Sequence, residues 1–110
     1  MGEEWTADDV TIRDDPEESA YLIEVGGIRA GKAEYRTMSD RRVFTHTEVA
    51  DEYSGMGLAS QVARFALDDM RDRRVDVVPL CPFFAAYIRR HPEYDEIVDH
   101  ELLRELKKRR

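Results

Sequence analysis

The sequence is short of cysteine and of long apolar runs, and each shortage excludes a class of protein. Its single cysteine, Cys81, excludes an intramolecular disulfide framework. No apolar stretch approaches the roughly 20 residues that a membrane-spanning helix needs. The first residues, MGEEWTADDV, lack the basic start and apolar run of a secretory signal. We therefore expect a soluble cytoplasmic protein without disulfides.

Positive charge is also scarce, because 17 lysines and arginines face 24 acidic side chains and the formal net charge is −7. Binding to nucleic acid or to an anionic membrane needs clustered Lys and Arg at the phosphates, so we expect neither partner. The charge is uneven: residues 1–52 hold 14 acidic and 6 basic side chains, whereas residues 53–110 hold 10 and 11. A ligand that carries phosphate should therefore favour the second half.

The 110 residues suit a loose acidic lead-in over residues 1–9 and one domain over residues 10–110. Alternating or β-rich stretches joined by short turns predict four strands, over 10–13, 20–25, 28–37 and 42–49. Helical spacing of apolar residues follows over 57–73, then a valine-rich strand over 75–80, a helix after Pro82 and a final helix over 99–110. The pattern predicts an α+β sandwich with a five-stranded, mostly antiparallel sheet, a central β-α-β crossover and flanking helices.

The stretch HTEVADEYSGMGLAS, residues 46–60, places Gly55 and Gly57 where an extended run becomes a helix. A helix start leaves backbone N–H groups free, with the positive end of the helix dipole behind them, so it favours an anion. Glycine lets a phosphate approach these groups and permits positive φ. The same pattern also fits a tight turn without chemistry, because two glycines alone are a weak signal.

Together with the later CPFFAAYIRRHPEY, this stretch resembles the GNAT superfamily of acetyl-CoA-dependent N-acetyltransferases, and within it a small single-domain YjdJ type. The resemblance covers roughly residues 10–94. The pyrophosphate motif of the superfamily, Gln/Arg-x-x-Gly-x-Gly/Ala, falls on residues 52–57. Both glycines match, but Glu52 replaces the usual Gln or Arg, and Ser54 stands where small members often have Arg.

The resemblance implies a GNAT fold, acetyl-CoA as cosubstrate, no metal, and an amine acceptor that is a small molecule or a peptide. It implies that the pyrophosphate lies on the amides from Met56 to Ser60 and that the pantetheine runs along the fourth strand. The implied cofactor-binding residues are Val49, Gly55, Met56, Gly57, Leu58, Ala59 and Ser60. Arg64, Arg89 and Arg90 are candidate phosphate neighbours or plain surface arginines.

Cys81 directly precedes Pro82, which predicts that the thiol stands at the N-cap of a short helix. The positive end of the helix dipole there favours the thiolate, the nucleophilic form. Most free cysteines are instead small buried apolar residues. The resemblance implies a part in acetyl transfer for a cysteine at this position, either as the acetyl carrier or as a wall of the cofactor channel.

Three further residues are candidates for proton transfer: His46, Glu48 and Tyr87. Strand alternation predicts two sets of side chains on opposite faces of the fourth strand: Phe44, His46 and Glu48 on one, and Val43, Thr45, Thr47 and Val49 on the core-facing other. Glu48 and His46 would then deprotonate an amine or a water, or form a solvent-facing pair. Tyr87 lies near where many GNAT enzymes carry a tyrosine that protonates the leaving thiolate, or it packs on the sheet.

Several alternatives stay open. His46 and Glu48 followed by Cys81 echo the zinc deaminases, but that site needs a second cysteine, which the chain lacks. A cysteine hydrolase triad of Cys81, His46 and Glu48 is conceivable on spacing alone. A CoA-binding regulatory module without transferase activity is favoured by the short lead-in, since larger GNAT enzymes shape an acceptor site with extra N-terminal helices. A structural interaction domain would bind no CoA.

Overall fold

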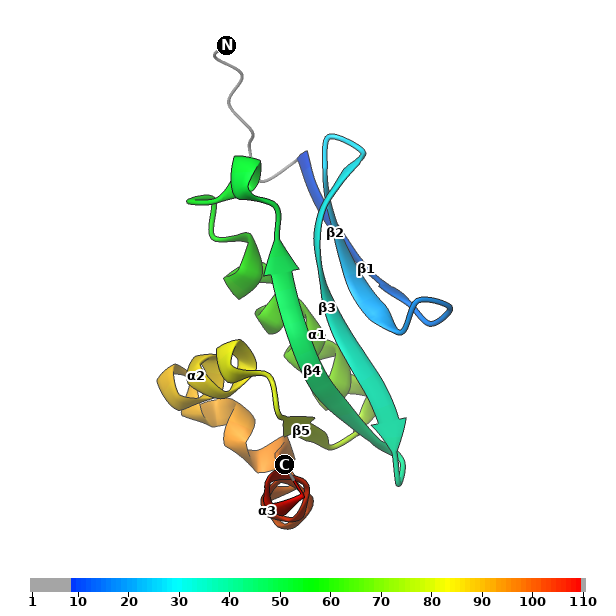
Figure 1. The fold of residues 1–110 in the computed structure, drawn as a ribbon, viewed down its shortest axis with the longest axis vertical. Coiled ribbons are helices and arrows are strands. Elements are labelled where there is room, and N and C mark those ends of the chain that lie inside the picture. Colours follow the sequence, from blue (N-terminus) through cyan, green and yellow to red (C-terminus); the bar gives the residue numbers. More distant parts are fainter. Residues whose placement is uncertain (1–8, 110) are drawn as a thin grey trace.

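The computed structural model describes residues 9–109, in which one five-stranded sheet carries helices on both faces (Figure 1). Residues 1–8, most of the expected lead-in, lie outside the described residues, as does residue 110. The strands are β1 (Val10–Asp15), β2 (Ala20–Val25), β3 (Ile28–Met38), β4 (Arg41–Val49) and β5 (Val77–Pro79). The helices are α1 (Leu58–Arg73), α2 (Pro82–Arg90) and α3 (His100–Lys108), with 3₁₀ segments η2 (Asp51–Tyr53) and η3 (Pro92–Ile97).

The strands lie side by side in sequence order, with antiparallel pairs from β1 to β4 and a parallel pair between β4 and β5. Gly26 and Gly27, with φ of 58° and 84°, form the turn between β2 and β3. Positive φ at both central residues suits a tight hairpin. Helix α1 makes the crossover from β4 to β5 and lies behind the sheet in Figure 1. This arrangement confirms the predicted α+β fold with its central β-α-β crossover.

Two apolar clusters hold the layers together. The larger one lies between the sheet and helices α1 and α2, where Phe44 of β4 stacks on Phe84 of α2 with ring centroids 4.3 Å apart. The smaller one joins Val43, Val78 and Leu106, so α3 covers the opposite face of the sheet only at the β5 end (Figure 1). Within residues 9–109, no helix is long and apolar enough to cross a membrane.

Several element boundaries differ from the prediction, most clearly at β5 and after Pro92. Strand β5 is only three residues long, because its ladder with β4 runs from Arg42 opposite Val77 to Phe44 opposite Pro79. The expected strand over 75–80 is therefore too long at both ends. After Pro92 the chain forms η3, a segment with no distinct periodicity in the sequence.

Strand β4 contains an irregularity that simple alternation misses. Glu34 of β3 pairs with His46 and Tyr35 pairs with Phe44, so Thr45 has no opposite residue in β3. One unpaired residue of this kind is a β-bulge, which bends the strand and re-aims the side chains on one side of it.

The bulge decides which side chains of β4 share a face. Phe44 is fully buried beside α2, and Thr47 and Val49 point to the same side, where they meet Cys81 and the larger core. The side chains of His46 and Glu48 are 55% and 56% exposed on the other side. The prediction that Phe44 shares a face with His46 and Glu48 is therefore wrong, because alternation assumes an unbroken ladder.

Candidate functional site

The turn between β4 and α1 has a shape that requires both glycines. Gly55 and Gly57 have φ of 86° and 73°, in the left-handed region where a residue with a Cβ is strained. A Cβ built at either position would meet no atom within 4 Å. Backbone conformation rather than crowding therefore selects glycine, and the space beside the turn is open.

The first turn of α1 offers backbone donors to this space. Gly57 is the N-cap and supplies no side-chain cap, and the first turn holds no acidic residue. In the described part of the chain, the N–H groups of Leu58, Ala59 and Ser60 donate to no protein acceptor, and helical bonding starts with Gln61 donating to the Gly57 carbonyl at 3.1 Å. Free donors at the positive end of a helix dipole favour an anion.

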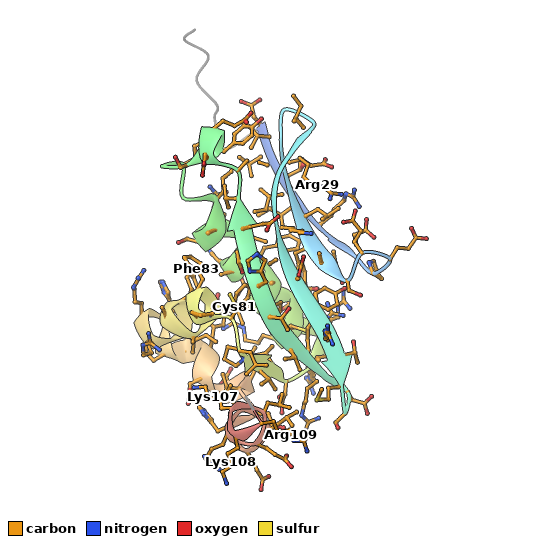
Figure 2. All side chains as sticks on the ribbon, in the orientation of Figure 1. Arg29, Cys81, Phe83, Lys107, Lys108 and Arg109 are labelled. Carbon is orange, nitrogen blue, oxygen red and sulfur yellow. The ribbon has the colours of Figure 1, made fainter. Side chains whose placement is uncertain are left out.

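A hollow of about 380 Å³ opens over this turn. It is bounded by the end of β4, the glycine turn, the first turn of α1 and Phe83, which projects from the start of α2 (Figure 2). Six of the seven expected cofactor-binding residues line it: Val49, Gly55, Gly57, Leu58, Ala59 and Ser60. Met56 instead packs against the larger core. Local sequence order and the fold thus bring these six residues to one place.

The charged surroundings of the hollow are less favourable to an anion than the amides are. Asp51 and Glu52 stand in η2, directly before the glycine turn, and Glu52 is exposed. Arg89 and Arg90 lie in the last turn of α2, at the opposite end of that helix from Phe83. Arg64 borders the neighbouring hollow instead, so the residues that line this one offer a phosphate backbone N–H groups rather than arginines.

Cys81 stands at the N-cap of α2, as the sequence predicts, and is 3% exposed. Its N–H donates to the Phe44 carbonyl at 2.8 Å, which holds the residue against β4 just after β5 ends. Figure 2 shows Cys81 between β4 and the start of α2. The Thr47 hydroxyl oxygen lies 3.3 Å from the Cys81 sulfur. No sequence signal points to Thr47, because the two residues are 34 positions apart.

His46 and Glu48 form a pair on the opposite face of β4. The His46 Nε2 atom lies 3.0 Å from Glu48 Oε1. Their partners across the strand ladder are Glu34 and Lys32, which form an ion pair at 2.8 Å. The hydrogen bond from Lys32 lowers the pKa of Glu34, so this face carries fixed charges of both signs. The structure keeps His46 and Glu48 together but separates them from Cys81 by the sheet, so the three do not form a hydrolase triad.

Tyr87 lines a neighbouring hollow of about 360 Å³ with Arg64, His91 and Tyr94. Its ring stacks on that of His91 with centroids 4.2 Å apart. Burial raises the pKa of Tyr87, so the phenol keeps its proton at neutral pH. Tyr87 does not border the hollow over the glycine turn. Among residues 9–109, no three His, Cys, Asp or Glu side chains are placed to hold a metal ion.

Comparison with known proteins agrees with this arrangement. Residues 20–97 match a family model described as GCN5-related N-acetyl-transferase. The structure is similar to the NMR solution structure of a GCN5-like protein from Staphylococcus aureus, proposed to be an N-acetyltransferase. The TM-score is 0.63 at 17% identity, covering 82% of this chain and 88% of that chain, a likeness that shows the fold. No curated protein matches. The chain belongs to the GCN5-related N-acetyltransferase family.

Proposed function

We propose that the protein is an acetyl-CoA-dependent N-acetyltransferase of the small single-domain YjdJ type, acting on an amine. The observation that carries the proposal is the set of free N–H groups at Leu58, Ala59 and Ser60, which face an open hollow. A diphosphate fits this position because it carries negative charge and many acceptor oxygens. Acetyl-CoA supplies the activated acetyl group as a thioester.

The residues around the hollow divide the binding between backbone and side chains. The amides of Leu58, Ala59 and Ser60 hold the diphosphate, and Gly55 and Gly57 shape the turn without a Cβ in its way. The pantetheine lies along the end of β4 at Val49 and against Phe83. Met56 supports the turn from the core side.

We assign Cys81 as the acetyl carrier. It lies on the same side of the sheet as the hollow, at the N-cap of α2. In this step the bond between the acetyl carbon and the CoA sulfur breaks as the bond to the Cys81 sulfur forms. The leaving CoA thiolate takes one proton from Tyr87, and the proton that Cys81 gives up restores the phenol, so the exchange is balanced.

Glu48 and His46 are the proposed proton acceptors for the amine. Their side chains are more than half exposed on the face of β4 away from Cys81, so they can take a proton from an amine before it attacks, without contacting the thiol. Tyr87 is the proposed acid for the leaving thiolate, since its phenol is protonated at neutral pH. Tyr87 lines the neighbouring hollow rather than the one over the glycine turn.

Calorimetric titration of the full chain with acetyl-CoA, followed by an assay over a panel of amines, tests the proposal. We expect saturable binding, amide NMR shifts centred on residues 55–60, and transfer to at least one amine. The acidic first half favours polyamines or lysine-rich peptides, with activity that falls as salt rises. Binding without transfer to any amine would indicate a CoA-binding regulatory module. If acetyl-CoA does not bind, both the transferase and the CoA-binding regulatory module are rejected, and a structural interaction domain remains.

A further inference from the structure

The hydroxyl group of Thr47 has one hydrogen-bonding neighbour, the sulfur of Cys81. The two atoms are 3.3 Å apart, and no other partner of this hydroxyl occurs within residues 9–109. Thr45, two residues earlier, differs: its hydroxyl donates to the backbone carbonyl of Glu34 at 3.3 Å. The hydroxyl of Thr45 therefore bonds to the backbone of β3, whereas the hydroxyl of Thr47 contacts only the Cys81 thiol among these residues.

The β-bulge brings Thr47 to the thiol. In an unbroken strand, Thr47 would point away from the face that carries Phe44, because side chains three positions apart lie on opposite faces. The unpaired Thr45 reverses this, so Phe44 and Thr47 share the face toward α2. Cys81 is tied to the same strand by its N–H bond to the Phe44 carbonyl. The β-bulge and the position of Cys81 at the N-cap of α2 together bring the Thr47 hydroxyl next to the sulfur.

The surroundings of the sulfur make this contact chemically important. Cys81 is a member of the larger apolar cluster, close to the stacked rings of Phe44 and Phe84. A buried anion without a hydrogen-bond donor is strongly disfavoured. A hydroxyl has one donor and two acceptor positions, so Thr47 can accept from the thiol and donate to the thiolate. It therefore keeps one hydrogen bond to the sulfur in both protonation states.

We propose that Thr47 is a positioning residue that orients the Cys81 sulfur and stabilises its thiolate for acetyl transfer. The inference rests on the proposed function, because a carrier role for Cys81 is part of it. Thr47 itself does not bond to the acetyl group. Its role requires the hydroxyl and not the methyl group of the side chain.

Two substitutions in the full chain distinguish the effect of the Thr47 hydroxyl from the effect of the shape of its side chain. Thr47→Val keeps the shape and removes the hydroxyl, and Thr47→Ser keeps the hydroxyl. We expect Thr47→Val to slow iodoacetamide alkylation of Cys81 by about tenfold or more, since a hydrogen bond to a charged group is lost. The pH profile of alkylation should move to higher pH, and acetylation of Cys81 by acetyl-CoA, followed by intact mass, should slow in parallel. Thr47→Ser should stay within about threefold of the wild type.

The matched control is Thr45→Val, which should alkylate at the wild-type rate. Thermal unfolding and acetyl-CoA affinity should stay unchanged in Thr47→Val. Should that variant fail to fold, Thr47→Ala against Thr47→Ser provides the same contrast. The proposal is overturned if Thr47→Val keeps the wild-type rate and pH profile, or if Thr47→Ser is as slow as Thr47→Val. If alkylation is slow in Thr47→Val but the wild-type protein is never acetylated by acetyl-CoA, the carrier role of Cys81 is rejected. The hydrogen bond between Thr47 and Cys81 would still stand.

Discussion

The two faces of β4 differ in almost every physical property, although their residues alternate along one short strand. On the side of α1 and α2, Thr47 and Val49 border apolar packing, a buried thiol and the hollow with free amides. On the other side, His46 and Glu48 are more than half exposed, beside the Lys32–Glu34 ion pair. The proposed function thus assigns acyl binding and sulfur chemistry to one face and proton transfer to the other.

The largest expected effect is on the buried face. Cys81→Ala should abolish acetylation of the protein by acetyl-CoA, because the chain has no other thiol. Intact mass after incubation with acetyl-CoA measures this, and the affinity for acetyl-CoA should stay within about twofold, since the amides of α1 are untouched. If the variant keeps full turnover on amines, the carrier route is eliminated and direct transfer remains.

Glu48→Gln and His46→Gln test the exposed face. Each should lower turnover on amines by about a hundredfold, the usual size of a lost general base, while acetylation of Cys81 and affinity for acetyl-CoA stay unchanged. Glu34→Gln is the matched control on the same face and should stay near wild type. Loss of Cys81 acetylation in Glu48→Gln would contradict the separation of the two faces.

Gly57→Ala tests the amide cradle. The left-handed backbone at this position, φ 73°, is unfavourable for alanine by about 1–3 kcal/mol, so the turn should distort. We expect acetyl-CoA affinity to fall about tenfold by calorimetry. Gly27→Ala, at φ 84° in the β2–β3 hairpin and likewise with nothing within 4 Å of its Cβ, is the control. It should lower thermal stability similarly without weakening binding; equal weakening by both variants would reject the cradle.

Glu52→Gln should act in the opposite direction. Removing a carboxylate beside the proposed diphosphate site at a helix start is worth about 0.3–1 kcal/mol, so affinity for acetyl-CoA should rise about two- to fivefold. The gain should shrink in high salt, where exposed charges are screened. Glu17→Gln, in the distant turn after β1, serves as control and should change nothing. An unchanged affinity in Glu52→Gln would show that no anion binds near η2.

The smallest expected effect concerns α3, which packs on the side of β4 opposite Cys81. The Leu102 N–H and the Arg41 guanidinium hold the pKa of Asp99 below its ordinary value of 3.8. Because the folded pKa is the lower one, the stabilisation is present above that value and is lost as pH falls below it. Urea unfolding over this range should show a loss that Asp99→Asn removes. Asp72→Asn, on α1, should leave the pH dependence intact.

Much of the fold could be predicted because the signals are local. The Gly26–Gly27 turn, the helical spacing over α1 and the proline at the start of α2 each act through a few neighbouring residues. The same locality explains why Gly55, Gly57 and Cys81 could be identified as candidates before their surroundings were known. A positive-φ turn before a helix and a residue before a helical proline constrain the backbone wherever they occur.

By itself, the sequence determined the order of the elements, the glycine turn and the position of the thiol at a helix start. Only the tertiary structure decided which side chains meet. The bulge at Thr45 depends on the register between β3 and β4, which pairing across the sheet sets and no single strand encodes. That register places Thr47 beside Cys81 and turns His46 and Glu48 away, because one unpaired residue is enough to exchange the two faces of a strand.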